Sequence, residues 1–193
     1  MTSILMPNLP KRVLVTGFGP FDGDSVNPSG LLLEWLNSQT FNFELQTVLL
    51  PVSFAQAYPQ LSRALEAFNP SHVILTGLAK NRSELTLERI AINWVDARIP
   101  DNDGLVLKTQ KIKEESEDGL FTTLPLLKML ESANKVGCPA KISTSAGEYV
   151  CNHLIYLYLV ENRTIPGTFI HLPAATNHQL FFQGVSAIIS SLE

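Results

Sequence analysis

One cysteine stands where its thiol could act as a nucleophile. The segment SAGEYVCN (145–152) places Cys151 after a turn of small residues, in the first turn of a predicted helix. A helix N-terminus carries partial positive charge and N–H groups that lack intrahelical acceptors. Because both features stabilise a thiolate, we expect a lowered pKa for Cys151, and the same N–H groups could hold an oxyanion. The alternative is that Cys151 is a small, inert residue of the core.

A cysteine nucleophile usually works with a histidine base, and the chain has four histidines. His171 is the best placed, because it lies near the carboxyl end of the predicted strand GTFIHLP, where ligands of α/β sheets gather. The other three are less suitable. His153 follows the cysteine by two residues and faces another side of the helix, His72 begins a strand, and His178 lies at the start of the last helix.

A third group should fix the tautomer and orientation of the imidazole. The candidates are carboxylates: Glu88, Asp96, Asp101 and Asp103. Spacing along the sequence does not choose among them. For Glu88, the alternative is a surface salt bridge with Arg82 or Arg89.

Short β-branched runs alternate with helical periods along the chain, which favours a mostly parallel sheet covered by helices on both faces. We therefore expect one α/β domain over residues 1–193. Apolar residues stand at odd positions up to Leu87 and at even positions from Ile90, and this switch predicts a β-bulge near Glu88 or Arg89. The charged segment 108–119 is predicted to be a surface loop. The predicted strands are 12–18, 43–52, 72–77, 85–99, 140–145 and 167–173, and the predicted helices begin near residues 28, 58, 124, 150 and 176.

Composition limits the possible partners. The formal net charge is −4 and there is no basic stripe, so neither nucleic acid nor an anionic membrane is an expected partner. The segment MTSILMPNLPKR lacks the basic start and long apolar run of a signal peptide. No stretch approaches the roughly 20 apolar residues that span a bilayer. With two cysteines only, we expect a cytoplasmic protein with reduced thiols.

No metal or cofactor is expected. No cluster of Cys and His has the spacing of metal ligands. The turn TGFGPFDG (16–23) departs from the dinucleotide-binding fingerprint, because Asp22 stands where the third glycine is required. Phe18 and Phe21 in this turn suggest an apolar clamp instead, with core packing as the alternative.

Five motifs, in order along the chain, resemble the signature segments of pyroglutamyl peptidase I, also called pyrrolidone-carboxylate peptidase. The resemblance implies a cysteine peptidase that removes an N-terminal pyroglutamyl residue from peptides. It also implies a three-layer α/β/α sandwich with a twisted, mixed sheet, and assembly as a homo-oligomer, a dimer or tetramer. The motifs are VLVTGFGPFDGDSVNPS, GLAKNRSELTLERIAIN, DARIPDN, SAGEYVCN and FIHLP.

The resemblance also implies roles for individual residues. By motif position, Cys151 is similar to the family nucleophile, His171 to the general base and Glu88 to the acidic member of the triad. Arg98 matches a residue near the oxyanion site. The positions that match substrate-binding regions of the family are Phe18, Phe21, Asn27, Gly77, Leu78, Tyr149 and Val150.

Three segments depart from the family pattern. The chain has PFDG where PFGG is usual, a shortened segment LKTQKIKEESEDGLFTTLP after DARIPDN, and LPAATNHQL after the histidine motif. The catalytic candidates are intact, but the surroundings of the substrate differ. Two alternatives therefore stay open: a non-catalytic protein that binds a lactam-capped peptide or metabolite, and an amidase that acts on another small cyclic amide.

Overall fold

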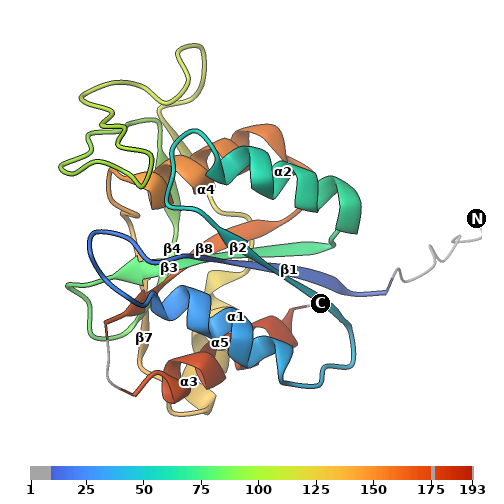
Figure 1. Ribbon diagram of the computed structural model, residues 1–193. Coiled ribbons are helices and arrows are strands. Elements are labelled where there is room, and N and C mark those ends of the chain that lie inside the picture. The colour runs from blue at the N-terminus through green and yellow to red at the C-terminus, as the bar shows by residue number, and fades with distance from the viewer. Residues whose placement is uncertain (1–9, 175–176, 193) are drawn as a thin grey trace, which may run out of the picture.

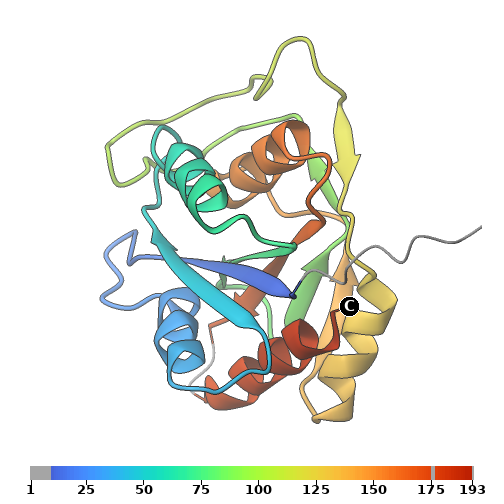
Figure 2. The same ribbon diagram turned by 90° about the vertical axis from the view of Figure 1, so that its right-hand side faces the viewer.

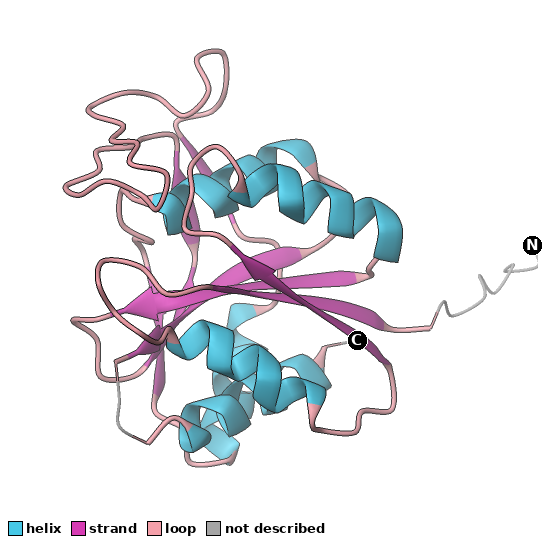
Figure 3. Ribbon diagram, viewed as in Figure 1, coloured by secondary structure: helices cyan, strands magenta, loops and turns pink. Residues whose placement is uncertain are grey.

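The computed structural model describes residues 10–174 and 177–192. Helices cover both faces of a central sheet (Figures 1 and 3). The strands are β1 (Arg12–Phe18), β2 (Glu44–Leu50), β3 (His72–Ala79), β4 (Leu85–Glu88), β5 (Ile90–Ile92), β6 (Gly119–Phe121), β7 (Ala140–Ser143) and β8 (Gly167–Pro173). The helices are α1 (Pro28–Asn37), α2 (Ala57–Phe68), α3 (Leu126–Lys135), α4 (Val150–Glu161) and α5 (Gln179–Ser191).

The central sheet is mixed, with strand order β2-β1-β3-β8-β4-β7. Strands β1, β2, β3 and β8 are parallel, as the alternating pattern predicts, and β4 runs antiparallel to β8. The mostly parallel, mixed sheet is therefore confirmed, although the alternating pattern alone does not predict this antiparallel pair. The physical reason is the short connection between β3 and β4, since residues 80–84 are too few for a crossover helix and the chain simply reverses.

The alternation of side chains along the strands builds a separate apolar core on each face of the sheet. On β1, Leu14 packs with residues of α2 and α4, whereas Val13 and Val15 pack with residues of α1, α3 and α5. Figure 1 shows the same division, with α2 and α4 on one side of the sheet and the other three helices opposite. The predicted three-layer α/β/α sandwich is confirmed.

The predicted strand 85–99 is wrong as a single element. It breaks at Arg89 into β4, in the central sheet, and β5, which pairs with β6 in a separate two-stranded sheet. The parity switch that suggested a bulge marks this change of sheet. The segment 108–119 runs mostly as loop, as predicted, on the side of the molecule that carries α2 and α4 (Figure 2). Its last residue, Gly119, opens β6, which the sequence pattern did not predict.

Helix boundaries follow local signals where these are strong. Asn27 caps α1 by accepting a 3.1 Å hydrogen bond from the Ser29 N–H, and Pro28 is the first helical residue, as predicted. The last helix begins at Gln179, and its predicted start at Thr176 lies outside the described residues. Among the helices in the described part of the chain, none combines the length and apolar character needed to cross a membrane.

Candidate active site

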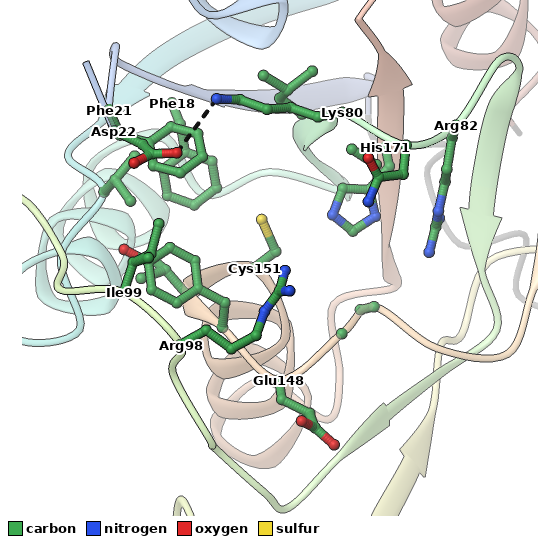
Figure 4. A pocket seen from close by; sticks show the side chains of 18 of the residues that line it. Phe18, Phe21, Asp22, Lys80, Arg82, Arg98, Ile99, Glu148, Cys151 and His171 are labelled. Carbon is green, nitrogen blue, oxygen red and sulfur yellow. Dashed lines mark hydrogen bonds and ion pairs between the residues drawn. The ribbon is translucent and has the colours of Figure 1, made fainter. Parts of the chain in front are cut away.

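A cavity of about 620 Å³ opens at the carboxyl ends of β1, β3 and β8 (Figure 4). Its walls come from the segments that follow β1 and β3, from residues 96–99 and from the turn before α4. Cys151 and His171 both line it. The lining also includes Phe18, Phe21, Asp22, Asn27, Leu78, Lys80, Arg82, Asp96, Arg98, Glu148, Tyr149 and Val150.

Cys151 is the second residue of α4 and is partly buried. The side chain of the N-cap residue, Tyr149, accepts no hydrogen bond from the first turn of α4, where N–H groups lack intrahelical acceptors. The predicted position in the first turn of a helix is therefore correct. Figure 4 shows the sulfur pointing from the helix end into the cavity.

His171 and Glu88 come together because β4 runs antiparallel beside β8. In this register Thr86 is opposite His171 and Glu88 is opposite Phe169, so Glu88 and His171 are diagonal neighbours on one face of the sheet. The imidazole Nδ1 lies 2.8 Å from Glu88 Oε1, and both side chains are buried. An ionised carboxylate only accepts hydrogen bonds, so Nδ1 carries the proton and Nε2 is left as the basic nitrogen.

A glycine brings the cysteine and the histidine together. Gly77 on β3 is the direct strand partner of His171 on β8. A Cβ at position 77 would lie only 3.0 Å from Cys151 Sγ and 2.8 Å from Phe169 Cζ. The absence of a side chain at Gly77 therefore creates the space in which the sulfur sits next to the imidazole strand.

Burial sets the protonation states of the two groups. It raises the pKa of Cys151 to about 12, and the charge of Glu88 adds to this rise. The lowered pKa expected from the helix N-terminus is therefore wrong, since loss of hydration outweighs the effect of the helix end. Burial likewise lowers the pKa of His171, against the opposing effect of Glu88. A neutral thiol thus faces a neutral imidazole that can accept its proton.

Glu88 is held ionised. Burial alone would raise the pKa of its carboxyl group, but the hydrogen bonds that Oε1 accepts, first from His171 and also from Arg82, outweigh burial and lower it. The structure also separates Glu88 from the other carboxylate candidates. Asp101 and Asp103 bond to the segment around Ser53 and Phe54, and Asp96 lies 3.7 Å from Lys108.

Arg98 lines the cavity from the segment that follows β5, and Figure 4 shows its guanidinium turned toward Cys151. Within the part of the chain that the structure describes, Arg98 makes no hydrogen bond or ion pair with another residue. Its position depends on Asn152, whose side-chain amide donates to the carbonyls of Ile92 and Trp94, at 2.9 and 3.0 Å. Asn152 thereby ties the segment that leads to Arg98 to the same helix that carries Cys151.

Aromatic side chains form one wall of the cavity. The Phe21 and Tyr149 rings lie 6.2 Å apart between centroids, and Phe18 is buried at the base of the first turn. The Tyr149 hydroxyl donates to the Pro100 carbonyl at 2.9 Å, which fixes that ring. Leu78 and Val150 add apolar surface, so these predicted substrate-binding residues do converge on one space.

Asn27 also lines the cavity, but most of its amide serves the fold. Its Oδ1 accepts from the Ser29 N–H and hydroxyl, and its Nδ2 donates to the Gly19 carbonyl at 3.0 Å. One amide hydrogen is left for a ligand.

The other histidines lie elsewhere, as predicted. His153 packs edge-on against Phe54, His178 stacks on Phe182, and His72 lies 2.9 Å from the Ser71 hydroxyl at the start of β3.

Two basic residues of the site were not predicted. Lys80 lies 2.6 Å from Asp24 and 3.5 Å from Asp22, at the rim beside Phe21 (Figure 4). Arg82 forms an ion pair with Glu88. The pair was expected only as an alternative, a salt bridge at the surface, whereas Glu88 is fully buried. The sequence feature that could have indicated a role for Lys80 and Arg82 is their position in the short connection between β3 and β4.

A thiol, an imidazole and a carboxylate at the carboxyl edge of an α/β/α sheet are the arrangement of a cysteine hydrolase. The chain belongs to the pyroglutamyl peptidase family, whose model matches residues 11–185. Curated relatives include the pyrrolidone-carboxylate peptidase of Thermosipho melanesiensis, 38% identical over 173 residues, or 88% of this chain and 86% of the relative. That of Thermococcus litoralis is 41% identical over 84% of this chain and 76% of its own length.

Solved structures of this family superpose on the chain. Pyroglutamyl peptidase I from Bacillus amyloliquefaciens matches with a TM-score of 0.87 at 30% identity, over 94% of this chain and 96% of the other. The pyrrolidone carboxyl peptidase from Thermococcus litoralis also gives a TM-score of 0.87, at 33% identity, over 94% and 92% of the two chains.

Proposed function

We propose that this protein is a cysteine peptidase that hydrolyses the amide bond after an N-terminal pyroglutamyl residue of peptides. The observation that carries the proposal is that Cys151, His171 and Glu88 meet beside an aromatic-walled cavity. Family membership supports the activity, and the geometry supports the assignment of these residues as nucleophile, base and orienting carboxylate.

The charges around the cavity favour a neutral lactam over a charged N-terminus. Pyroglutamate has no free α-amino group, so its site needs no carboxylate partner. Asp22 is paired with Lys80, Asp96 with Lys108, and Glu88 with Arg82. Figure 4 shows the Glu148 carboxylate turned away from the sulfur. An ammonium group entering the aromatic slot would lose its hydration without a partner, at a cost of several kcal/mol.

In the first half of the reaction, the Cys151 thiol transfers its proton to His171 Nε2 as the sulfur attacks the carbonyl carbon that follows the lactam ring. The resulting oxyanion is stabilised by first-turn N–H groups of α4 and by Arg98. The C–N bond then breaks, and His171 delivers the proton to the departing amine. Glu88 stabilises the imidazolium while it carries the proton.

In the second half, His171 takes a proton from water, and the hydroxide attacks the thioester carbonyl. The C–S bond breaks, the sulfur regains a proton from His171, and free pyroglutamate leaves. A neutral resting pair suits this sequence, because the imidazole acts as a base in both halves.

A panel of fluorogenic amides tests the activity. Pyroglutamyl, prolyl and alanyl amides of aminomethylcoumarin are compared with the wild-type protein and with Cys151→Ala. We expect turnover of the pyroglutamyl amide alone, and none by the variant. Binding of the pyroglutamyl compound without turnover would indicate a non-catalytic lactam-binding protein, and preferred turnover of another cyclic amide would indicate a different amidase.

Location and assembly also form part of this proposal. Both cysteines are free thiols, which suits catalysis in a reducing, cytoplasmic compartment. Assembly as a homo-oligomer follows the family resemblance, and light scattering during size-exclusion chromatography tests it.

A further inference from the structure

Arg82 connects the carboxylate of the site to the turn that carries the nucleophile. It lies in the β3–β4 connection, and one guanidinium nitrogen, Nη1, donates to Glu88 Oε1 and to the Thr86 hydroxyl. The other, Nη2, donates to the Ser145 carbonyl at 2.8 Å. Ser145 belongs to the turn that enters α4, six residues before Cys151. A single planar group therefore touches both halves of the site.

Arg82 and His171 bond to the same oxygen of Glu88. Oε1 accepts from Arg82 and lies 2.8 Å from His171 Nδ1. The Glu88 side chain is fully buried, while the Arg82 side chain is 24% exposed. The negative charge of Glu88 is thus partly neutralised by the guanidinium, so that it attracts a proton to the imidazole less strongly. The positive charge of Arg82 also opposes protonation of His171 directly.

We infer that Arg82 is a positioning residue: it fixes the Glu88 carboxylate relative to the nucleophile turn, and it keeps His171 in the neutral form that acts as a base. This inference rests on the proposed function. It assigns to Arg82 two separable contributions, one from its charge and one from the reach of its forked guanidinium to Ser145.

The electrostatic surroundings of the imidazole agree with this role. The titratable groups that act on His171 are Glu88 from β4, which raises its pKa, and Arg82, which lowers it, with burial as the larger effect. The thiol of Cys151 faces it from α4. Other charged side chains line the same cavity and are common to every variant below: Asp22, Lys80, Asp96, Arg98 and Glu148.

Two substitutions separate the two contributions. Arg82→Gln removes the charge, and Arg82→Lys keeps the charge but lacks the fork that reaches Thr86, Glu88 and Ser145 together. Arg89 supplies the matched control, because it is an exposed arginine next to Glu88 in sequence whose guanidinium lies 5.2 Å over the Phe121 ring. The Arg89→Gln and Arg89→Lys variants carry the same changes away from the site.

The readout is the pH profile of kcat/KM on a pyroglutamyl coumarin amide, with Tm recorded for each variant. For Arg82→Gln, we expect the half-maximal pH of the acid limb to rise by about one unit, which lowers kcat/KM about tenfold on the acid side. For Arg82→Lys, we expect the acid limb to stay at the wild-type pH. The plateau value of kcat/KM should fall about tenfold, because the turn that leads to Cys151 is misplaced. Both Arg89 variants should keep the wild-type profile.

A substrate-free measurement keeps this test apart from the test of the proposed function. In histidine-labelled protein, NMR titration reports the protonation of His171 directly, with His171→Gln for assignment. We expect Arg82→Gln to raise the pKa of this imidazole. If Arg82→Gln does not fold, Arg82→Lys still tests the reach to Ser145. The inference would be overturned if the Arg82 variants kept the wild-type pH profile of kcat/KM and the wild-type titration of His171 and lost only Tm. Arg82 would then form a structural salt bridge and no more.

Discussion

Gly77→Ala is the most demanding test of how the site is packed. Gly77 pairs with His171 across the sheet, and the added methyl group would lie 3.0 Å from Cys151 Sγ and 2.8 Å from Phe169 Cζ. Favourable contacts between such atoms lie near 3.5 to 4.0 Å. Both the sulfur and the ring must therefore move away from the methyl group, by roughly 0.5 to 1 Å.

That displacement should affect catalysis more than stability. Overpacking of this kind costs about 1 to 3 kcal/mol of folding free energy. A shift of about 1 Å in a reacting atom costs on the order of 100-fold in rate. We therefore expect Gly77→Ala to remain folded, with a lower Tm and with kcat/KM reduced by one to two orders of magnitude.

The assay is steady-state turnover of a pyroglutamyl coumarin amide, below the Tm of every variant. Gly184→Ala is the matched control, because its methyl group would lie 2.4 Å from the sulfur of the other cysteine, Cys138, in the opposite core. We expect this control to lose stability and to keep wild-type kinetic constants. Wild-type kcat/KM in Gly77→Ala, or equal kinetic losses in both variants, would refute the packing argument.

Three further predictions concern charge. Because burial lowers the pKa of His171, kcat/KM should reach half its maximum below pH 6.5. Because burial raises the pKa of Cys151 to about 12, kcat/KM should stay flat into the alkaline range. A bell-shaped pH profile centred near neutrality would contradict this prediction. Burial lowers the pKa of His153 to about 4 from 6.5, so the unfolded chain takes up a proton that the folded chain excludes. Stability present above pH 6.5 should fall toward pH 4 by up to about 3 kcal/mol, and urea unfolding of His153→Phe should show a smaller decline. Lys80→Gln removes the rim contacts with Asp22 and Asp24, so KM should rise a few-fold with kcat unchanged; because the wild-type ion pairs are screened by salt, the difference should shrink at high ionic strength.

Strong local signals made much of the fold predictable. Asn27 and Pro28 specify a helix start, and α1 begins there. The β-branched run that ends at His171 predicts a strand, and the small-residue turn before Cys151 predicts a helix N-terminus. Each of these depends on interactions among residues close in sequence, which is why the pattern suffices.

The features that the residue pattern left open or gave wrongly depend on contacts between distant segments. The choice of Glu88 over three aspartates rests on the antiparallel pairing of β4 with β8, which no periodicity encodes. The pKa of Cys151 follows from its burial against Gly77, and the role of Arg82 depends on a turn 63 residues further along the chain. Cys151 does lie in the first turn of a helix, as predicted, but burial outweighs the helix N-terminus and raises the pKa of its thiol.

The most direct test of the central claim is the activity of Cys151→Ser on a pyroglutamyl coumarin amide, with Tm as the check on folding. This exchange keeps the side chain close in size but removes the sulfur that we propose as the nucleophile. We expect a wild-type Tm and a loss in kcat of about 10⁴-fold or more. Near-normal turnover by a folded Cys151→Ser protein would contradict the account.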